Sequence, residues 1–489
     1  MPTGDLKTST IKSLFWKLFE QGGTSLITLV VQIVMARLLA PAEFGVLAIM
    51  LVFVNIGNVL VQSGLNTAII QAPDASERDY STVFWMSLAI SLVLYAAVFF
   101  CAPLVAAFYS MPTLVAPLRV LVLVLIINSF NSIQEAIVAR NLEFKKTFRA
   151  TVTASAVSGV GGIAVAVAGG GIWALVVQQL LFQLSKCLVL ALQIPWKPRA
   201  VFDRDRAERL FGFGWKLLAS GLLDQGYQSL SDLVIGKLFT STDLGYVSQG
   251  KKYPLALGTM LDGAIQPVML SAVSHIQDDS ARVKRLARRG LKTSTFLIVP
   301  SMTAFAVAAN PIVVLLLGEK WLPCVPFLQA YCFIYAMLPV HTTNLQVLNG
   351  MGRSDLFLRL EVEKKVVGLA ILFVSAFVMR SLTAIICGYV INTIIATFIN
   401  AAPNKRVIGY SYLEQIRDIC PAYGLSALAG AAAWPVGMLG LPLVLAIVVQ
   451  VVLVYGIFAV LARLLHLEEY DYIVSTMREM RQRRASSAR

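Results

Sequence analysis

Long stretches of almost uninterrupted apolar side chains constrain this chain more than any other feature, and the segments 92–107 and 441–460 are clear examples. A helix needs about 20 apolar residues to cross the ~30 Å hydrocarbon core of a bilayer. The apolar fraction over 489 residues is 57%, which exceeds the roughly half that is usual in soluble domains. A membrane β-barrel would instead alternate apolar and polar residues. The sequence therefore predicts an all-α polytopic membrane protein.

Turn residues and charges divide the apolar sequence into fourteen predicted membrane-spanning helices. The regions near 215–275 and 320–365 carry more polar residues than the rest, so the bounds of the eighth, tenth and eleventh helices are the least sharply defined. The predicted spans are 11–36, 43–65, 80–108, 113–139, 147–168, 172–194, 211–238, 245–275, 291–317, 321–350, 355–379, 382–403, 414–438 and 441–464.

The charged, proline-containing segment WKPRAVFDRDRAERL at 196–210 is the strongest internal break. It predicts a cytoplasmic linker between two six-helix lobes. The expected domains are an N-terminal lobe at 1–195, the linker at 196–210, a C-terminal lobe at 211–404, two additional transmembrane helices at 405–465 and a basic cytoplasmic tail at 466–489.

The two halves of the chain share short sequence features in the same order. Trp-Lys pairs occur at 16–17 and 215–216, ARLLAPAEFG at 36–45 matches GKLFTSTDLG at 236–245, and GGGIWALV at 169–176 matches MRSLTAII at 379–386. Chance similarity between apolar strings would account for the last pair alone. Because each half has six helices, the repeats are parallel, as in transporters whose two lobes alternate access to a central cleft.

Basic residues are distributed unevenly over the two sides of the predicted bundle. The formal net charge is +14, and most of the 41 Lys and Arg residues fall on the side of the two termini. The opposite side has only Arg37, Lys237, Lys320 and Arg380. Cytoplasmic loops carry such an excess, so both termini are predicted to be cytoplasmic. A short amphipathic helix at 276–290 and the tail beyond 467 are expected to lie on the anionic inner leaflet, and no nucleic-acid partner is expected.

Four predicted helices carry polar residues at helical spacing. Charges and amides are costly in hydrocarbon unless they face a bundle interior or a wet cavity, so these stripes are candidate functional sites. Hydrogen bonding between helices is the alternative explanation. The stripes are Lys17, Gln21, Thr24, Thr28 and Gln32; Asn55, Asn58 and Gln62; Lys216, Ser220, Asp224, Gln228 and Ser231; and Ser248, Lys252, Thr259, Asp262 and Gln266.

Charged residues within the spans supply the candidate substrate site. Lys17 and Lys216 lie near the cytoplasmic surface, where a lysine can also simply extend to the interface. Lys252 lies deeper, and Asp224 and Asp262 are placed to pair with lysines or to bind a coupling cation. The predicted substrate-binding residues are Lys17, Arg119, Lys186, Lys216, Lys251 and Lys252, and the predicted ion-pair or coupling-ion residues are Glu135, Asp224 and Asp262.

Signatures of enzymes, cofactors and metals are not found in the sequence. Six single cysteines lie in apolar runs without ligand spacing, and three histidines have no Ser or Cys partner at a recognisable spacing. No phosphate-binding P-loop string occurs. We therefore expect no catalytic residue, no metal and no cofactor. The first ten residues lack the apolar core of a signal peptide, so the first helix is expected to remain in the mature chain.

Six strings in order resemble one family of membrane proteins: VMARLLAPAEFGVLAI, GLNTAIIQ, ARNLEFKK, GGGIWALVVQQL, LGYVSQGKKYPLAL and LLGEKWLPCVPFLQ. They are similar to Wzx-type polysaccharide flippases, the colanic-acid and exopolysaccharide exporter branch of the multidrug/oligosaccharidyl-lipid/polysaccharide (MOP) superfamily. The resemblance runs from about residue 14 to 404. It departs from the family pattern at Lys251, where the family has a hydrophobic or aromatic residue before a lysine like Lys252.

The resemblance implies a flippase of the bacterial inner membrane that moves an undecaprenyl-diphosphate-linked oligosaccharide repeat unit to the periplasmic leaflet. The carrier-linked glycan and the lipid bilayer would be its partners, with a polysaccharide polymerase and co-polymerase as further partners to test. The double lysine would then reflect a more anionic headgroup or a local tilt of the eighth helix.

Three other functions are compatible with part of the sequence. A lipid II flippase would differ only in the sugar. A cation-coupled drug or metabolite antiporter of the same superfamily should have a net acidic cleft, whereas lysines outnumber carboxylates among the candidates here. A membrane glycosyltransferase or ligase would ordinarily have a large periplasmic loop, and the predicted outer loops are short.

Overall fold

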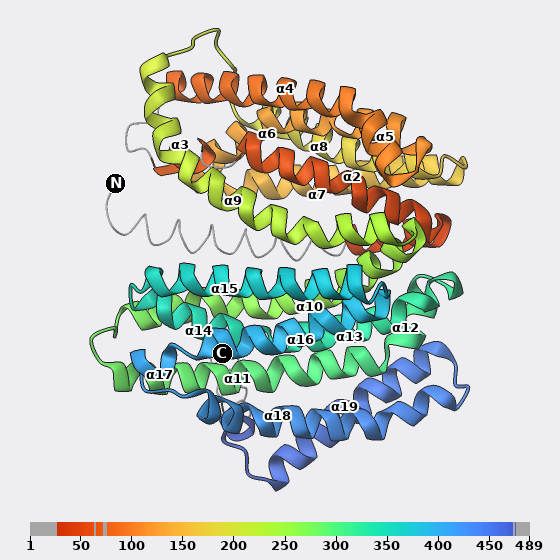
Figure 1. Ribbon diagram of the computed structural model, residues 1–489, viewed down its shortest axis with the longest axis vertical. Helices are drawn as coiled ribbons and strands as arrows, with labels where there is room; N and C mark the ends of the chain where they lie inside the picture. The colour runs from red at the N-terminus through yellow and green to blue at the C-terminus, as the bar shows by residue number, and fades with distance from the viewer. Residues whose placement is uncertain (1–26, 63–64, 72–75, 473–474, 476–489) are drawn as a thin grey trace, which may run out of the picture. The chain divides into compact units, whose positions relative to one another are not determined.

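The computed structural model describes residues 27–62, 65–71, 76–472 and 475, except for the side chains at 71, 213, 216, 264 and 354. The described residues form helices joined by short turns, with no β-strand among them (Figure 1). Contacts divide the chain into two compact units, Met1–Gly245 and Tyr246–Arg489, which are considered separately.

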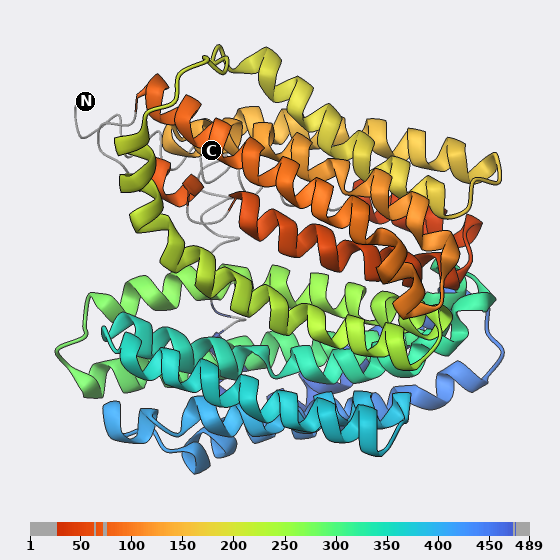
Figure 2. The same ribbon diagram turned by 45° about the horizontal axis from the view of Figure 1, so that its top comes forward.

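The first unit is built from helices that pack on one another, and Figure 2 gives a second view of them. The helix α7 packs along α8, α4 packs on α6, and α9 packs on α2, α3 and α4. At one end of the unit, Phe84, Ile133 and Leu210 belong to one buried core. The helices are Ile27–Leu38, α2 Pro41–Gln62, α3 Leu65–Gln71, α4 Glu77–Tyr109, α5 Val115–Leu121, α6 Leu123–Arg140, α7 Phe144–Val167, α8 Ile172–Gln193 and α9 Arg204–Leu238.

The second unit takes up most of α10 and all later helices. The helix α11 is central to it and packs on α13, α14, α18 and α19. The helices are α10 Ser241–Ser274, α11 Ser280–Val307, α12 Ala309–Leu316, α13 Val325–Ala336, α14 Leu338–Gly350, α15 Ser354–Phe373, α16 Leu382–Ala401, α17 Asn404–Val407, α18 Tyr412–Ala433 and α19 Leu443–Leu464.

Eleven helical stretches in the described part of the chain are long and apolar enough to cross a membrane. Of the other three predicted spans, the seventh and the eleventh are helical as well and correspond to α9 and α15. The helix Ile27–Leu38 covers the described end of the first span, and α9 and α15 are not among the eleven. The prediction of an all-α polytopic membrane protein is confirmed.

The turn before α2 and the turn before α10 use the same hydrogen bond. The Ala40 N–H donates to Glu43 Oε2 at 2.7 Å, and the Thr240 N–H donates to Asp243 Oδ2 at 3.1 Å. The sequence analysis paired these two carboxylates, and both satisfy an N–H before the first turn of a helix.

Within the first unit, the first turns of α2 and α10 are in direct backbone contact. A β-carbon on Gly45 would lie 1.7 Å from the Ser241 carbonyl oxygen, and one on Gly245 would lie 2.1 Å from the Pro41 carbonyl oxygen. The two paired glycines of the repeated turn are therefore required, because a side chain at either position would collide with the backbone of the other helix.

Later helix boundaries also recur in the second half. The residue before α7 is Glu143 and the residue before α15 is Arg353, while Gly171 precedes α8 and Ser381 precedes α16. The contacts of α7 and α6 with α8 recur as the contacts of α15 and α14 with α16. This recurrence agrees with the predicted pair of parallel lobes.

Two details differ from the sequence analysis. The basic segment 276–290 is not a separate amphipathic helix, because from Ser280 it continues through Gly290 without a break into the span as α11. The contact division falls at Gly245, beyond the linker expected at 196–210, because α9 packs within the first unit. The predicted domain bounds otherwise remain a prediction.

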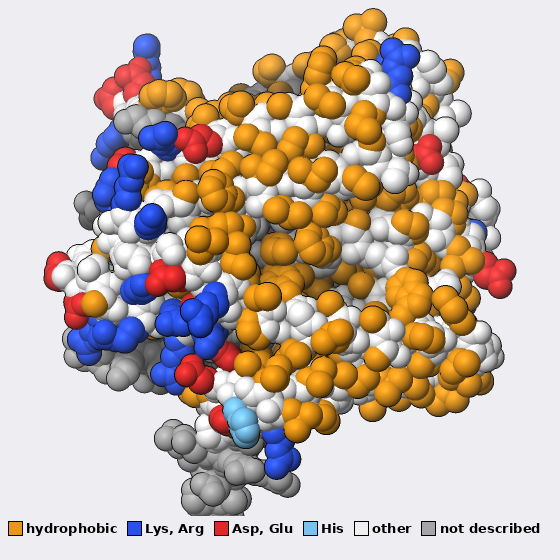
Figure 3. All heavy atoms as spheres, turned by 60° about the horizontal axis from the view of Figure 1, so that its bottom comes forward, with side chains coloured by type: hydrophobic (Ala, Val, Ile, Leu, Met, Phe, Trp, Pro, Cys, Tyr) orange, Lys and Arg blue, Asp and Glu red, His pale blue; other side chains and the backbone are white. Residues whose placement is uncertain are grey.

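Charged side chains gather at one end of the helices. In the face drawn in Figure 3, Lys and Arg side chains cluster there, and hydrophobic side chains cover most of the remaining surface. Exposed apolar residues such as Val93, Phe100 and Leu104 on α4 are more than 65% accessible. A surface of this kind is expected where helices face lipid.

Candidate functional site

In the first unit, the polar face of α6 contacts three other helices through side-chain hydrogen bonds. Asn128 Nδ2 donates to Asn58 Oδ1 of α2 at 2.7 Å, and Ser132 Oγ donates to Asn66 Oδ1 of α3 at 2.6 Å. Asn131 Nδ2 donates to the α8 residue Gln183. Asn128, Asn131 and Ser132 are buried, so these bonds replace water within the bundle.

An ion pair lies one turn further along α6. The α8 residue Lys186 contacts the carboxylate of Glu135, and the two side chains are 17% and 35% exposed. The sequence analysis proposed Lys186 for substrate binding and Glu135 for an ion pair or a coupling ion. The structure brings the two together, so each has a protein partner.

The helix Ile27–Leu38 contributes to a polar cavity of about 190 Å³ in the first unit. Thr28 and Gln32, from the first predicted stripe, line it together with Ser155 of α7 and Gln178 of α8. The side-chain oxygens of Gln32, Ser155 and Gln178 are buried without a hydrogen-bond partner in the described part of the chain. The cavity is therefore able to accept hydrogen-bond donors such as water or hydroxyl groups.

In the second unit, α14 takes the place that α6 has in the first. Asn344 Nδ2 donates to Gln415 Oε1 of α18 at 2.8 Å, and Asn404 Nδ2 donates to Asn344 Oδ1 at 2.6 Å. A ring nitrogen of His341 lies 2.9 Å from Asn400 Nδ2 of α16. These side chains join α14 to the helices that surround it.

The helix α14 also binds Asp262 of α10. Thr342 Oγ1 donates to Asp262 Oδ2 at 2.8 Å, and Asp262 Oδ1 is buried without a partner in the described part of the chain. No group of three or more His, Cys, Asp or Glu side chains that could hold a metal ion occurs among the described residues. Asp262 therefore has one free acceptor oxygen, and the described residues do not surround it with a cation site.

Lys251 and Lys252 lie about three turns into α10, directly after Gly250. A β-carbon at Gly250 would be 2.8 Å from Phe327 Cβ of α13, so the helices are in close contact there. Both lysines are partly exposed. In contrast to Lys186, neither has a hydrogen-bond or ion-pair partner among the residues that the structure describes. The expected pairing of Asp262 with a nearby lysine does not occur among these residues.

The polar stripe of α9 follows one exposed face of that helix. Ser220, Asp224 and Gln228 are exposed, and Gln228 Nε2 donates to Asp224 Oδ2 at 2.7 Å, one turn away. The stripe is thus continuous in the structure. The side chain of Lys216 and the whole of Lys17 lie outside the described residues.

Arg119 lies apart from the other candidates. Its Nε donates to the Phe99 carbonyl oxygen of α4 at 3.0 Å, and its guanidinium is 4.2 Å from the centre of the Phe99 ring. These contacts fix α5 against α4. A structural role accounts for Arg119, and its predicted role in substrate binding remains a prediction.

Apart from Glu135, the polar side chains of α6 and α14 described here were not among the predicted site residues. Both helices carry a polar run within an otherwise apolar span, NSFNSIQE at 128–135 and HTTN at 341–344. That run was a usable signal. The sequence could not show which helices the amides contact, because the partners are more than 50 residues away in sequence.

Together the fold and the buried polar faces define a multi-pass membrane protein with the architecture of MOP-superfamily transporters. Two solved structures share the fold: the lipid II flippase MurJ in its inward closed conformation, with a TM-score of 0.74, 12% identity and coverage of 93% of this chain and 99% of that chain; and an inward-facing multidrug resistance MATE family transporter of the MOP superfamily, with a TM-score of 0.60, 16% identity and coverage of 79% and 94%.

The family model described as polysaccharide biosynthesis protein matches residues 34–326, and the chain belongs to this family. It is 24% identical to the lipopolysaccharide biosynthesis protein WzxC of Escherichia coli K12 over 88% of each chain. It is 23% identical to the succinoglycan biosynthesis transport protein ExoT of Rhizobium meliloti, covering 72% of this chain and 71% of the other. The resemblance inferred from the sequence is confirmed.

The Glu135–Lys186 ion pair provides a test of the first polar cluster. We predict that Glu135→Gln lowers the free energy of unfolding in detergent by about 1 kcal/mol, because it leaves a partly buried lysine unpaired. The double exchange Glu135→Lys with Lys186→Glu should recover most of this loss. Thermal unfolding monitored by tryptophan fluorescence would measure both effects.

The matched control is Glu363→Gln, which removes an ion pair with Arg359. The side chain of Glu363 is 42% exposed and that of Arg359 is 74% exposed. That variant should unfold at nearly the wild-type temperature. Equal effects of the two single variants, or no recovery in the exchanged pair, would contradict a structural role for Glu135 and Lys186 as a pair.

Proposed function

We propose that this protein moves an undecaprenyl-diphosphate-linked oligosaccharide repeat unit from the cytoplasmic to the periplasmic leaflet by alternating access, for polysaccharide biosynthesis. The observation that carries the proposal is the similarity to WzxC over 88% of both chains. The name of ExoT adds that a second relative is a transport protein. None of these names describes an enzyme reaction, which supports a role in transport.

The charge distribution of the spans is compatible with an anionic substrate. A diphosphate with about two negative charges would pay tens of kcal/mol to enter hydrocarbon without partners. Cations and hydrogen-bond donors lining a wet path would remove most of this cost. Lys251 and Lys252, which have no counter-ion among the described residues, are the side chains that we propose for the diphosphate.

The remaining polar surfaces are suited to the sugars. Amides and hydroxyls recognise sugar hydroxyl groups as both donors and acceptors. We assign the glycan to the exposed stripe of α9 and to the cavity lined by Thr28, Gln32 and Gln178. The polyprenyl tail would stay in the lipid. In this proposal Lys17 and Lys216 flank the cytoplasmic entrance, both termini are cytoplasmic, and the protein resides in the bacterial inner membrane.

Two solved structures with this fold suggest other substrates. Lipid II is suggested by MurJ and a drug by the MATE transporter, but at 12% and 16% identity these likenesses concern the fold alone. The polysaccharide relatives are more similar in sequence at 23–24%. The unpaired lysines of α10 also favour an anion over the cationic substrates expected of many antiporters. A polymerase and its co-polymerase would be the proteins that receive the product.

The test is a deletion of the gene in its native host. We predict loss of one surface or secreted polysaccharide, with accumulation of its lipid-linked repeat unit in the cytoplasmic leaflet, because synthesis continues while translocation stops. Mass spectrometry of extracted carrier lipids would quantify the repeat unit. Normal polysaccharide with accumulated lipid II would support the lipid II flippase, and normal polysaccharide with altered drug sensitivity would support the antiporter.

Complementation of the deletion tests the assignment of Lys252. We predict that Lys252→Ala lowers polysaccharide export about ten-fold or more at equal protein level, because it removes a charge-assisted contact worth roughly 1.5–3 kcal/mol. Lys252→Arg should restore part of the export, since it keeps the charge. Lys197→Ala, in the exposed connection between α8 and α9, is the control and should export normally. Full export by the Ala variant at low expression would remove Lys252 from the substrate site.

A further inference from the structure

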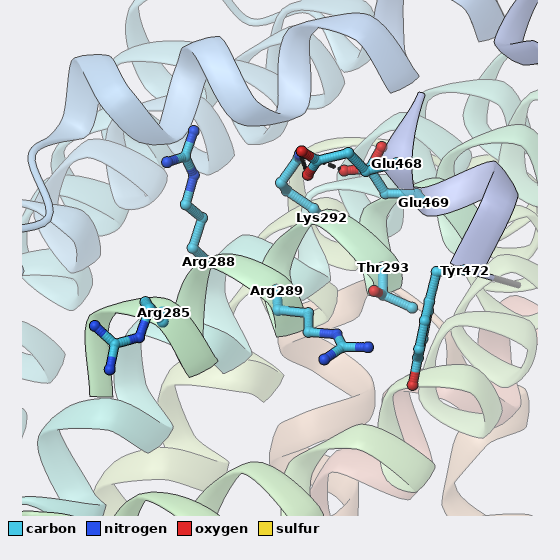
Figure 4. Close-up of a pocket in the computed structure, with 8 residues that line it drawn as sticks. All are labelled: Arg285, Arg288, Arg289, Lys292, Thr293, Glu468, Glu469 and Tyr472. Carbon is cyan, nitrogen blue, oxygen red and sulfur yellow. Dashed lines mark hydrogen bonds and ion pairs between the residues drawn. The ribbon is translucent and has the colours of Figure 1, made fainter. Parts of the chain in front are cut away.

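A basic cavity of about 410 Å³ lies beside residues 285–293 of α11 in the second unit (Figure 4). The α11 residues Arg285, Arg289 and Lys292 line one wall, and Glu468 and Tyr472, which follow α19, line the other. This cavity contains none of the residues assigned above to the transported glycan lipid.

Two of the four cations that line the cavity are already neutralised. Lys292 Nζ lies 2.6 Å from Glu469 Oε1 and 3.2 Å from Glu468 Oε2. Arg288 lies 2.7 Å from Asp418 Oδ1 of α18. These ion pairs fix the wall of the cavity, and their three carboxylates more than neutralise Lys292 and Arg288.

Arg285 and Arg289 carry the excess charge. Among the residues that the structure describes, neither has a carboxylate partner or a hydrogen bond. The guanidinium of Arg289 lies 4.1 Å from the centre of the Tyr472 ring, toward which it points in Figure 4. Contact with an aromatic face orients a guanidinium and leaves its N–H groups in the ring plane free to donate.

The strip of the α11 surface that carries Arg285 and Arg289 changes from basic to apolar along the helix. Arg285, Arg289, Thr293 and Leu297 are spaced four residues apart and so follow one another on neighbouring turns. Leu297 is 46% exposed, and from Phe296 onward the helix is almost entirely apolar. Arg285 and Arg289 therefore lie where the span leaves the hydrocarbon. The exposed apolar side chain of Leu297 lies further along the helix, toward the hydrocarbon.

The segment after α19 is anchored beside this strip. Leu467 and Tyr470 pack against the buried core that contains Phe296 of α11 and Phe458 of α19. The position of Tyr472 relative to Arg289 thus follows from hydrophobic packing. The cavity is a built feature of the second unit rather than a gap between loose side chains.

We propose that this cavity binds the phosphodiester headgroup of an anionic glycerophospholipid of the bilayer. A guanidinium presents two parallel N–H donors that match the oxygens of a phosphate. The headgroup would contact Arg285 and Arg289, and an acyl chain would lie along Leu297. The excess of basic residues on this side assigns the lipid to the cytoplasmic leaflet, and the proposal does not depend on the substrate that the protein transports.

The test measures lipids bound to the full-length protein. The wild-type protein is reconstituted in bilayer discs of phosphatidylethanolamine with phosphatidylglycerol, extracted gently and examined by native mass spectrometry. We expect phosphatidylglycerol to be retained selectively. The double variant Arg285→Gln, Arg289→Gln should retain about ten-fold less, a change that corresponds to ~1.4 kcal/mol.

The matched control is Arg282→Gln. Arg282 is an exposed arginine of the same helix that does not line the cavity, so this variant should retain phosphatidylglycerol as the wild type does. Equal losses in the control and the double variant would reduce the effect to general surface charge and would overturn the proposal. Displacement of phosphatidylglycerol by an equimolar amount of undecaprenyl diphosphate would also overturn it, in favour of the carrier lipid.

A gain of binding separates the site from any defect in folding. The side chain of Glu468 is 89% exposed, and Lys292 keeps Glu469 as its partner when Glu468 is removed. Glu468→Gln should therefore raise the retention of phosphatidylglycerol a few-fold, because one negative charge leaves the cavity. Unchanged or reduced retention in this variant would contradict the proposed site.

Discussion

A polar group placed within the hydrocarbon layer needs a partner in the protein, in trapped water or in a ligand, and the internal organisation of both units depends on this requirement. In the first unit, α6 meets it through Asn128 and Asn131, which bond to neighbouring helices. In the second unit, α14 meets it through His341 and Asn344. The same position in each repeat thus supplies polar contacts to neighbouring helices, which in the second unit include α18 beyond the six-helix lobe. Lipid-facing surfaces can then remain apolar.

The same requirement distinguishes charged side chains that have a partner within the protein from those that have none among the described residues. The Glu135–Lys186 pair and the Arg119 contacts satisfy their members within the protein, which makes these residues structural elements in our account. Lys251 and Lys252 have no such partners among the described residues. An unpaired cation on the polar face of a spanning helix is costly unless water or a ligand reaches it. This contrast is the physical reason to place the anionic group of a substrate at α10.

The sequence was sufficient for the fold class, for the spans that the structure describes and for the repeated turn, because these depend on local signals. Apolar stretches near 20 residues define spans, and the Glu43 and Asp243 carboxylates act on an N–H three residues away. The pairing of Lys186 with Glu135 was not predictable, since it depends on how α6 and α8 are rotated in the bundle. The continuity of α11 was missed because a basic amphipathic segment and the start of a span have the same local pattern.

The central claim is that this chain by itself moves a diphosphate-linked glycan lipid across a bilayer. It is tested most directly with purified protein in vesicles whose membrane contains a radiolabelled undecaprenyl-diphosphate oligosaccharide. Membrane-impermeant periodate outside the vesicles oxidises each glycan that is exposed at the outer surface, so the oxidised fraction reports exposure. The account predicts that vesicles with protein expose nearly all of the glycan within minutes, whereas protein-free vesicles and those with the Lys252→Ala variant expose about half. Equal exposure with and without protein, across a range of ion gradients, would contradict it.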